Sequence, residues 1–156
     1  MKKAQITTIE RLKWRLFFQR YVLGLRIIFL TGAFDIIHLG HTRYFEKAVN
    51  LGGILIVGLR SDEWIRQQKG EGRPTFNWDI RAEVLSSLRS IRYIINIDSL
   101  PEMHEIIKEL NPHIIVVSET DEGTGKDPKT MRKIHGKKVI SFPPQAKFNS
   151  TDLIKT

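Results

Sequence analysis

The stretch that decides the fold is Thr31-Gly32-Ala33-Phe34-Asp35-Ile36-Ile37-His38-Leu39-Gly40-His41. It follows an apolar run at 26–30 that predicts a buried strand, and it leads into a helical pattern at 40–51. In open α/β sheets, ligands bind outside the carboxyl ends of the strands, and a helix N-terminus there offers free N–H groups to phosphate. Because Gly32 also lets the backbone approach a ligand closely, this order predicts a phosphate site.

Two histidines open the expected helix. His38 and His41 are three residues apart, so they face the same way on a helical turn, and Gly40 leaves room beside them. Two imidazoles so placed can donate hydrogen bonds to one phosphate group. A metal pair and two incidental surface histidines are the alternatives. Since no second cluster supplies further metal ligands, we expect no protein metal site.

The rest of the chain alternates between strand and helix patterns. Strand-like runs are expected at 26–30, 54–59, 93–97, 114–117 and 139–142. Helical patterns are expected at 40–51, 61–67, 78–90, 101–110 and 128–136, with a terminal helix beginning near Ser150. This alternation predicts an α/β fold, a three-layer sandwich in which helices cover both faces of a parallel sheet and the crossovers are right-handed.

A separate helix is expected before this domain, at 8–23, with an apolar stripe of Ile9, Leu12, Leu16 and Phe17. We therefore divide the chain into an N-terminal extension, 1–24, and one domain, 25–156. The stripe must be buried, either across a homodimer interface or over the back of its own sheet. The basic residues of this helix also leave open a role at a membrane surface or in partner binding.

Composition bounds the function. The 156 residues suit one domain plus the extension, and 25 Lys and Arg against 17 acidic residues give a formal charge of +8. That excess favours anionic ligands: nucleotides, phosphorylated metabolites, nucleic acid or acidic membranes. The absence of Cys excludes disulfides and Cys-based zinc sites, and it fits a reducing, cytoplasmic location. The longest apolar run near the N-terminus is too short for a membrane span.

The motifs resemble those of a known family. Gly-Ala-Phe-Asp-Ile-Ile-His-Leu-Gly-His at 32–41 resembles the first motif of the cytidylyltransferase-like nucleotidyltransferase superfamily. Three further segments are similar to the adenylyltransferase domain of ADP-heptose synthases: Ser61-Asp62 followed by Lys-Gly-Glu-Gly-Arg-Pro at 69–74, Asp79-Ile80-Arg81, and Asn-Ser-Thr-Asp-Leu-Ile at 149–154. The resemblance covers 26–156.

The resemblance implies a Rossmann-like fold and an enzyme that transfers a nucleotidyl group from an NTP to a phosphorylated small molecule, with release of pyrophosphate. ATP and a sugar phosphate are the favoured substrates, and Mg²⁺ is expected to accompany the nucleotide. Lys69, on a Gly-rich loop, and Arg81 are expected to offset phosphate charge, and Asp35 to hold the loop. The implied catalytic residues are His38, His41, Lys69 and Arg81. The implied nucleotide-binding residues are Thr31, Gly32, Ala33, Phe34, Asp35, His38, Gly40, His41, Arg81, Asn149, Ser150 and Thr151.

One departure from the family keeps alternatives open. The segment 118–126 lacks the glycines that relatives carry after the fourth strand, beside the base. A glycerol-3-phosphate cytidylyltransferase and an FAD synthase are therefore alternatives within the family. A non-catalytic nucleotide- or nucleic-acid-binding module is the alternative outside it. Nucleic acid is not favoured as a partner, because RNA-recognition motifs are absent.

Overall fold

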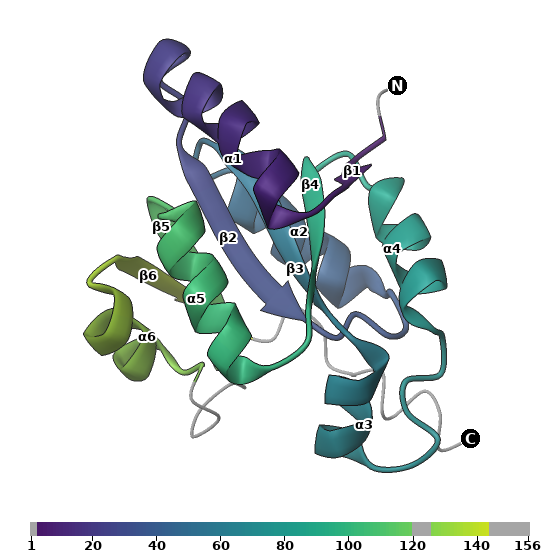
Figure 1. Ribbon diagram of the computed structural model, residues 1–156. Coiled ribbons are helices and arrows are strands. Elements are labelled where there is room, and N and C mark those ends of the chain that lie inside the picture. Colours follow the sequence, from purple (N-terminus) through teal and green to yellow (C-terminus); the bar gives the residue numbers. More distant parts are fainter. Residues whose placement is uncertain (1–2, 120–125, 144–156) are drawn as a thin grey trace.

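The computed structural model describes residues 3–119 and 126–143, and within them a single parallel sheet forms the centre of the molecule (Figure 1). Its strand order is β1-β4-β3-β2-β5-β6. The strands are β1 (Gln5–Ile6), β2 (Ile27–Gly32), β3 (Ile54–Arg60), β4 (Tyr93–Ile97), β5 (Ile114–Ser118) and β6 (Lys138–Phe142). All pairs run parallel, as the alternation of strand and helix patterns predicts.

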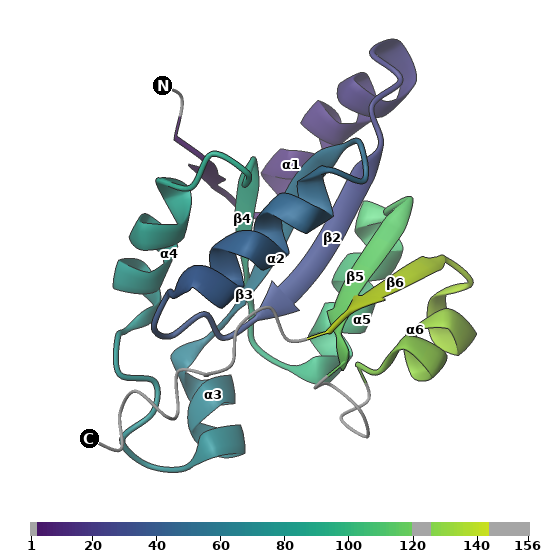
Figure 2. The same cartoon turned by 180° about the vertical axis from the view of Figure 1, so that it is seen from behind.

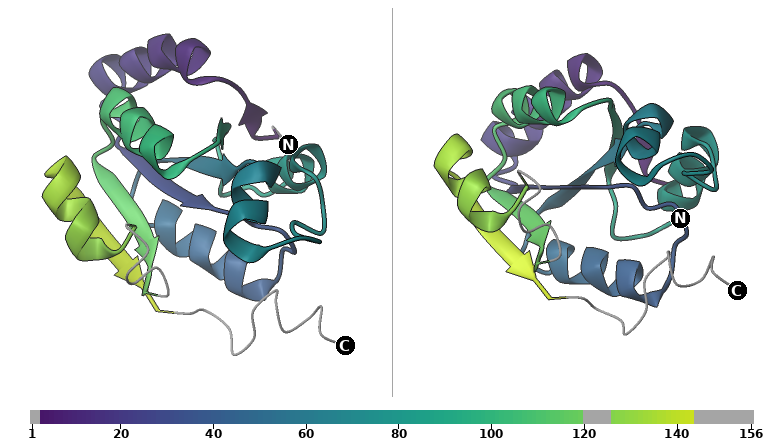
Figure 3. Two further views of the ribbon diagram at one scale, coloured as in Figure 1. Left: turned by 60° about the horizontal axis from the view of Figure 1, so that its bottom comes forward. Right: turned by 90° about the horizontal axis from the view of Figure 1, so that it is seen from below.

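Helices cover both faces of the sheet, so the predicted three-layer sandwich is confirmed (Figures 1 and 2). One face carries α1 (Ile9–Phe17), α5 (Leu100–Leu110) and α6 (Pro128–His135). The other face carries α2 (Leu39–Val49) and α4 (Trp78–Ser86). Helix α3 (Asp62–Lys69) lies beyond the carboxyl ends of the strands (Figure 3).

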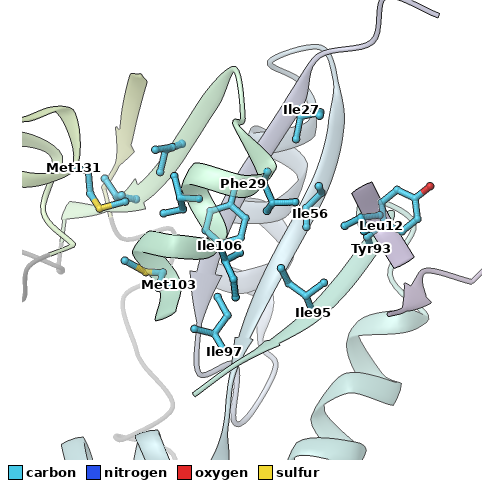
Figure 4. Packing of buried hydrophobic residues seen from close by; sticks show 14 of the residues in the cluster. Leu12, Ile27, Phe29, Ile56, Tyr93, Ile95, Ile97, Met103, Ile106 and Met131 are labelled. Atoms are coloured by element: carbon cyan, nitrogen blue, oxygen red, sulfur yellow. The ribbon is translucent and has the colours of Figure 1, made fainter. Parts of the chain in front are cut away.

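The central strands are buried on both faces. In β2, Ile27 and Phe29 point to the layer that contains α1 and α5, whereas Ile28 and Leu30 point to the layer that contains α2 and α4, and all four side chains are fully buried. Figure 4 shows the first layer, in which Phe29 and Ile106 lie between the sheet and α5. Such two-sided burial is typical of parallel sheets.

The strand order reverses beside β2. From β2 the chain moves through β3 to β4 on one side and then crosses, through α5, to β5 on the other side. Both neighbours pair directly with β2, with Phe29 opposite Ile56 and Ile28 opposite Ile114. The carboxyl end of β2 is therefore at a topological switch point, where open α/β sheets bind their ligands.

The N-terminal helix packs over its own sheet, which is one of the two arrangements expected for it. Leu12 and Leu16 are buried against the core, and Lys13 forms a 2.8 Å ion pair with Glu109 of α5. The helix continues from α1 as a π-helical segment, η1 (Phe18–Val22). The expectation that Phe17 belongs to the buried stripe is wrong, since its side chain is 56% exposed.

Three local expectations are corrected. Strand β1, which pairs with β4 at the sheet edge, was not expected from the sequence. Helix α4 ends at Ser86 rather than at residue 90, because the hydroxyls of Ser86 and Ser87 bond to carbonyls three residues back and compete with the helical ladder. Lys69 is the last residue of α3 rather than a loop residue, with Gly70 ending the helix at φ 88°. The terminal helix expected near Ser150 lies outside the described residues.

In the part of the chain that the structure describes, every helix falls short of the length and apolarity that crossing a bilayer demands.

The packing of α1 predicts a sharp contrast between two neighbouring positions. Leu12→Ala should lower the free energy of unfolding by about 2–5 kcal/mol, because it leaves a cavity between α1 and the sheet. Trp14→Ala on the same helix should change it by less than about 0.5 kcal/mol, because Trp14 is 81% exposed. Chemical denaturation measures both, and equal midpoints for Leu12→Ala and the wild type would contradict this packing.

Candidate active site

The loop after β2 is shaped by a close contact between Gly32 and Phe34. A Cβ at position 32 would lie 2.5 Å from the Phe34 ring, so only glycine fits there. Phe34 itself has a positive φ of 46° and is buried. Its ring packs against Phe45 at 4.9 Å and, edge to face, against His41 at 5.4 Å between centroids. The Phe34 ring thus packs against the His41 ring and limits its movement.

The two histidines lie together at the start of α2. His38 is the N-cap residue, and its Nδ1 accepts a hydrogen bond of 3.1 Å from the backbone N–H of Gly40. The His38 and His41 rings lie 3.9 Å apart between centroids with 33° between their planes. Because Nδ1 of His38 is an acceptor, its neutral ring carries the proton on Nε2 and presents a donor there. The expectation that both imidazoles share one location is met by this geometry.

Both histidines favour the neutral form. Burial lowers the pKa of His38. Burial, and then the neighbouring charges of His38 and Lys69, lower the pKa of His41 to about 4. At neutral pH the pair therefore lacks positive charge until an anion arrives. A phosphate placed against the rings would favour their protonated forms.

Asp35 is a buried anchor between two loops. Its carboxylate accepts hydrogen bonds from the backbone N–H groups of Thr75, at 2.9 Å, and Phe76, at 3.0 Å. It also faces Nε of Arg73 at 3.4 Å. These contacts match the expected role of Asp35 in holding the loop, and they leave it occupied by protein donors.

Arg81 is fully buried and bonded to protein on several sides. Its guanidinium donates to the carbonyl oxygens of Phe76 at 2.9 Å, Ala33 at 2.6 Å and Arg60 at 2.9 Å. It also forms a 2.6 Å ion pair with Asp62, whose other carboxylate oxygen accepts from the N–H of Trp78. The geometry thus gives Arg81 protein acceptors where contact with nucleotide phosphates was expected.

A group of cations lies beside the histidines. Partial desolvation, and then the charges of Arg73 and Arg60, lower the pKa of Lys69, while Asp35 opposes this effect. Arg60 is buried at the end of β3, with its guanidinium over the Trp64 ring at 4.9 Å and Nη1 bonded to Gln68. Nη2 of Arg73 is buried without a hydrogen-bond partner among the described residues.

Sequence reasoning missed Arg60 and Arg73. Arg73 belongs to the Lys-Gly-Glu-Gly-Arg-Pro segment, so its position directly after the second glycine, Gly72, was the available signal. Arg60 is the last residue of a strand next to β2, and a charge at the carboxyl end of a buried strand points to a ligand.

The remaining expected residues divide into two groups. The Thr31 hydroxyl bonds to the carbonyl of Gly58 at 2.9 Å and so ties β2 to β3 instead of standing free. Ala33 contributes its carbonyl to Arg81, and Gly40 its N–H to His38. Asn149, Ser150 and Thr151 lie outside the described residues. Within the described ranges, no group of three or more His, Asp or Glu side chains gathers around a metal position.

Solved structures share this fold. A lipopolysaccharide core biosynthesis protein from Thermoplasma volcanium superposes with a TM-score of 0.63 at 26% identity, covering 81% of this chain and 100% of that one. A pantoate-beta-alanine ligase from Francisella tularensis superposes with a TM-score of 0.68 at 13% identity, covering 96% of this chain and 75% of that one, which is a likeness of fold alone.

Curated relatives are similar over most of the domain. The bifunctional protein HldE of Aliarcobacter butzleri is 38% identical over 120 residues, which are 77% of this chain and 25% of that protein. The HldE protein of Campylobacter curvus is 46% identical over 98 residues, 63% of this chain and 21% of that protein. The chain thus spans about a quarter or less of these relatives. The model of the cytidylyltransferase-like family matches residues 29–155, from the middle of β2 onward. The chain belongs to the cytidylyltransferase-like family of nucleotidyltransferases.

Proposed function

We propose that this chain transfers the adenylyl group of ATP to a sugar phosphate and releases pyrophosphate. The observation that carries the proposal is the close pair of neutral histidines at the switch point of the sheet, next to Lys69, which Arg73 and Arg60 adjoin in turn. This arrangement supplies donors and positive charge for phosphates, and a transfer between phosphates needs no protein nucleophile.

The choice of substrates rests on the relatives and on the sequence motifs. Two of the curated relatives are bifunctional HldE proteins, and the segments at 61–74 and 79–81 resemble the adenylyltransferase domain of ADP-heptose synthases. The similar solved structure from Thermoplasma volcanium is a lipopolysaccharide core biosynthesis protein. These points favour ATP and a sugar phosphate over CTP and glycerol phosphate.

The mechanism is one of positioning and charge stabilisation. An oxygen of the acceptor phosphate attacks the α-phosphorus of ATP, the bond to the β-phosphate oxygen breaks, and pyrophosphate leaves with that electron pair. His38 and His41 donate to the phosphoryl oxygens, whose charge grows in the transition state. Lys69 and the unpartnered Nη2 of Arg73 offset charge on the triphosphate and the leaving group.

Two carboxylates near the site, Asp35 and Asp62, are already occupied by protein donors. Mg²⁺ would therefore enter on the phosphates of the nucleotide, and it would supply neutralisation of their charge.

Arg81 and Asp35 act as positioning residues in this proposal. Arg81 holds the carbonyl of Ala33, in the loop before His38, while Asp35 holds the loop that carries Arg73. Residues 31–35 with Gly40 form the phosphate-binding turn. We propose that Asn149, Ser150 and Thr151 complete the nucleotide site from the other side, and that residues 1–24 are an extension to a domain at 25–156.

A screen of pyrophosphate release tests the function. The four NTPs are each combined with hexose and heptose phosphates and with glycerol 3-phosphate, with Mg²⁺ or with excess EDTA. We expect release only with ATP, a sugar phosphate and Mg²⁺ together. Faster release with CTP and glycerol 3-phosphate would establish the cytidylyltransferase alternative. Tight nucleotide binding without any release would establish a non-catalytic module.

Replacement of His41 tests the histidine pair. His41→Ala should lower kcat by about 10²–10³-fold, since losing one preorganised donor costs about 3–4 kcal/mol in the transition state. Pyrophosphate release under saturating substrates measures this. Turnover within a factor of about three of the wild type would refute the assignment.

The pH dependence of the free energy of unfolding tests whether the His41 imidazole has a lowered pKa in the folded protein. His41→Ala removes that imidazole and serves as the comparison. A histidine with a pKa of about 4 when folded and 6.5 when unfolded binds more protons in the unfolded state at intermediate pH. The wild type should therefore lose stability as the pH falls from 6.5 towards 4. Folded His41→Ala should lose less over the same window.

Variants of Arg81 and Arg73 distinguish a positioning role from direct contact with phosphate. Arg81→Gln should lower the free energy of unfolding by about 3–5 kcal/mol, because it leaves Asp62 and three carbonyls without their donor. Arg73→Gln should change stability much less, because Asp35 keeps its two backbone donors, but it should raise the KM for ATP or lower kcat. Denaturation and steady-state kinetics on both variants measure this, and the opposite pattern would exchange their roles.

A further inference from the structure

An apolar arm projects from the amino edge of the sheet, which is the end where the strands begin, opposite the active site. It comprises α1, η1 and the turn to β2, and its exposed side chains are Trp14, Phe17, Phe18, Tyr21, Val22 and Leu23. Trp14 is 81% exposed, Tyr21 67% and Val22 61%. Figures 1 and 2 show the arm extending past the amino end of β2, whereas α3 and the site lie at the carboxyl end. An exposed group of large apolar residues of this extent marks a binding surface.

The arm has two apolar faces, one buried against the core and one exposed to solvent. Leu12 and Leu16 face the sheet and are buried, so they account for the packing of the helix on the core. At 100° per residue, Trp14 falls on the opposite face of α1, with Arg11 and Arg15 along one margin. Phe18 and Tyr21, in the π-helical η1, are exposed as well. Aromatic residues flanked by basic ones are typical of helices that lie in a membrane interface.

A basic cavity of about 590 Å³ lies beside the arm at the same edge. Its lining includes Arg20, Tyr21, His113, Lys137 and Lys138, and none of the described residues that line it is acidic. Arg20 donates to the carbonyls of Leu110 and Asn111, and Lys137 to the side-chain oxygen of Asn111, but these acceptors are neutral.

The cavity remains electropositive despite the helix ends beside it. Asn111 and Gly136 are the C-cap residues of α5 and α6, and each helix end contributes about half a negative elementary charge. Three cations in the lining exceed that. Burial, and then the charges of Arg20, Lys137 and Arg26, lower the pKa of His113.

His113 adds a neutral donor to this set. The backbone N–H of Ile27 donates to Nδ1 of His113 at 3.0 Å, so the proton of the neutral ring is on Nε2. The cavity thus combines ammonium, guanidinium and imidazole donors in the pattern that a phosphate group requires.

We propose that the chain docks through this edge onto a bilayer of anionic phospholipid. The aromatic side chains of the arm enter the interfacial region, and the cavity receives a headgroup phosphate. Tyr21 and Arg20 belong to both features, so one contact engages them together. The active site, at the other end of the strands, then faces away from the membrane and stays open to its substrates (Figure 1).

Charge favours this occupant over a second copy of the chain. Residues 9–26 carry five basic side chains against one acidic side chain, Glu10. A two-fold contact between copies places the same patch against itself, so these like charges would face one another. An anionic surface complements them instead.

Vesicle co-sedimentation tests the proposal on the full chain. One set of vesicles contains equal parts of phosphatidylglycerol and phosphatidylcholine, and the other contains phosphatidylcholine alone. We expect binding to the first set, weakened by salt, with a blue shift of tryptophan fluorescence that Trp14→Phe removes. Absence of binding to the first set, or equal binding to both, would overturn the proposal.

Charge variants locate the contact. Lys137→Gln with Lys138→Gln should lower partitioning by about 30-fold, since each basic residue near an anionic surface contributes about fivefold. Arg66→Gln with Lys129→Gln removes the same charge from α3 and the first turn of α6, away from this edge, and should leave partitioning nearly unchanged. If both double variants lost partitioning equally, net charge alone would explain the binding, and the proposed contact would be wrong.

Apolar variants separate the membrane from a second copy. Trp14→Ser with Phe18→Ser should abolish vesicle binding while the melting temperature and pyrophosphate release stay unchanged, because both residues are exposed and far from the site. Sedimentation of the wild type without vesicles should give the mass of one chain. If the wild type had the mass of two chains and the double variant the mass of one, the arm would bind a second copy of the chain and not a bilayer.

Discussion

The buried guanidinium of Arg81 holds together the segments that form the site. It joins the end of β3, the loop after β2 and the turn before α4 through three carbonyls, and it is neutralised by Asp62 at the start of α3. A buried charge is tolerated only when it is paired and fully hydrogen-bonded, so these segments have one arrangement in which the charge is satisfied. That arrangement ties Ala33, in the loop before His38, to the end of β3 and to the turn before α4.

The electrostatics of the site follow from what this arrangement leaves unsatisfied. The Asp35 carboxylate accepts hydrogen bonds from the backbone of Thr75 and Phe76 and pairs with Arg73, so its negative charge is already balanced within the loop. Burial, and then the charges of His38 and Lys69, lower the pKa of His41, while burial, and then the charges of Arg73 and Arg60, lower the pKa of Lys69. This excess of positive charge suits the triphosphate of the proposed substrate.

The two ends of the parallel sheet have different chemistry. At the carboxyl end, the loop after β2 and the N-terminus of α2 form the proposed phosphate site. At the amino end, the carboxyl ends of α5 and α6 line the same cavity, together with Arg20, Lys137 and Lys138. The N-terminal helix buries Leu12 and Leu16 against the core but leaves its aromatic residues outside. The candidate active site and the exposed aromatic residues therefore lie at opposite ends of the strands.

The sequence by itself determined the features that depend on local patterns. The alternation of apolar runs and helical periods predicted the parallel sandwich, because strands buried on both faces are continuously apolar. The spacing of His38 and His41 predicted their shared location, because one helical turn separates them. The motif at 32–41 predicted the family, which the match over residues 29–155 confirms.

Only the tertiary structure decided the roles that depend on distant partners. The family resemblance implied that Arg81 contacts phosphate, whereas the partners that the structure gives it are carbonyls and Asp62, from segments that only the fold brings together. Arg73 and Arg60 lie 13 positions apart in the sequence and meet at Lys69 only across the strand ends. Phe17 fits the period of the buried stripe, yet it is exposed although Leu16 in the same turn is buried, because the core covers only the side of α1 that carries Leu12 and Leu16. Periodicity records which residues share a face, whereas the depth of a core and the pairing of buried charges depend on contacts between segments far apart in the chain.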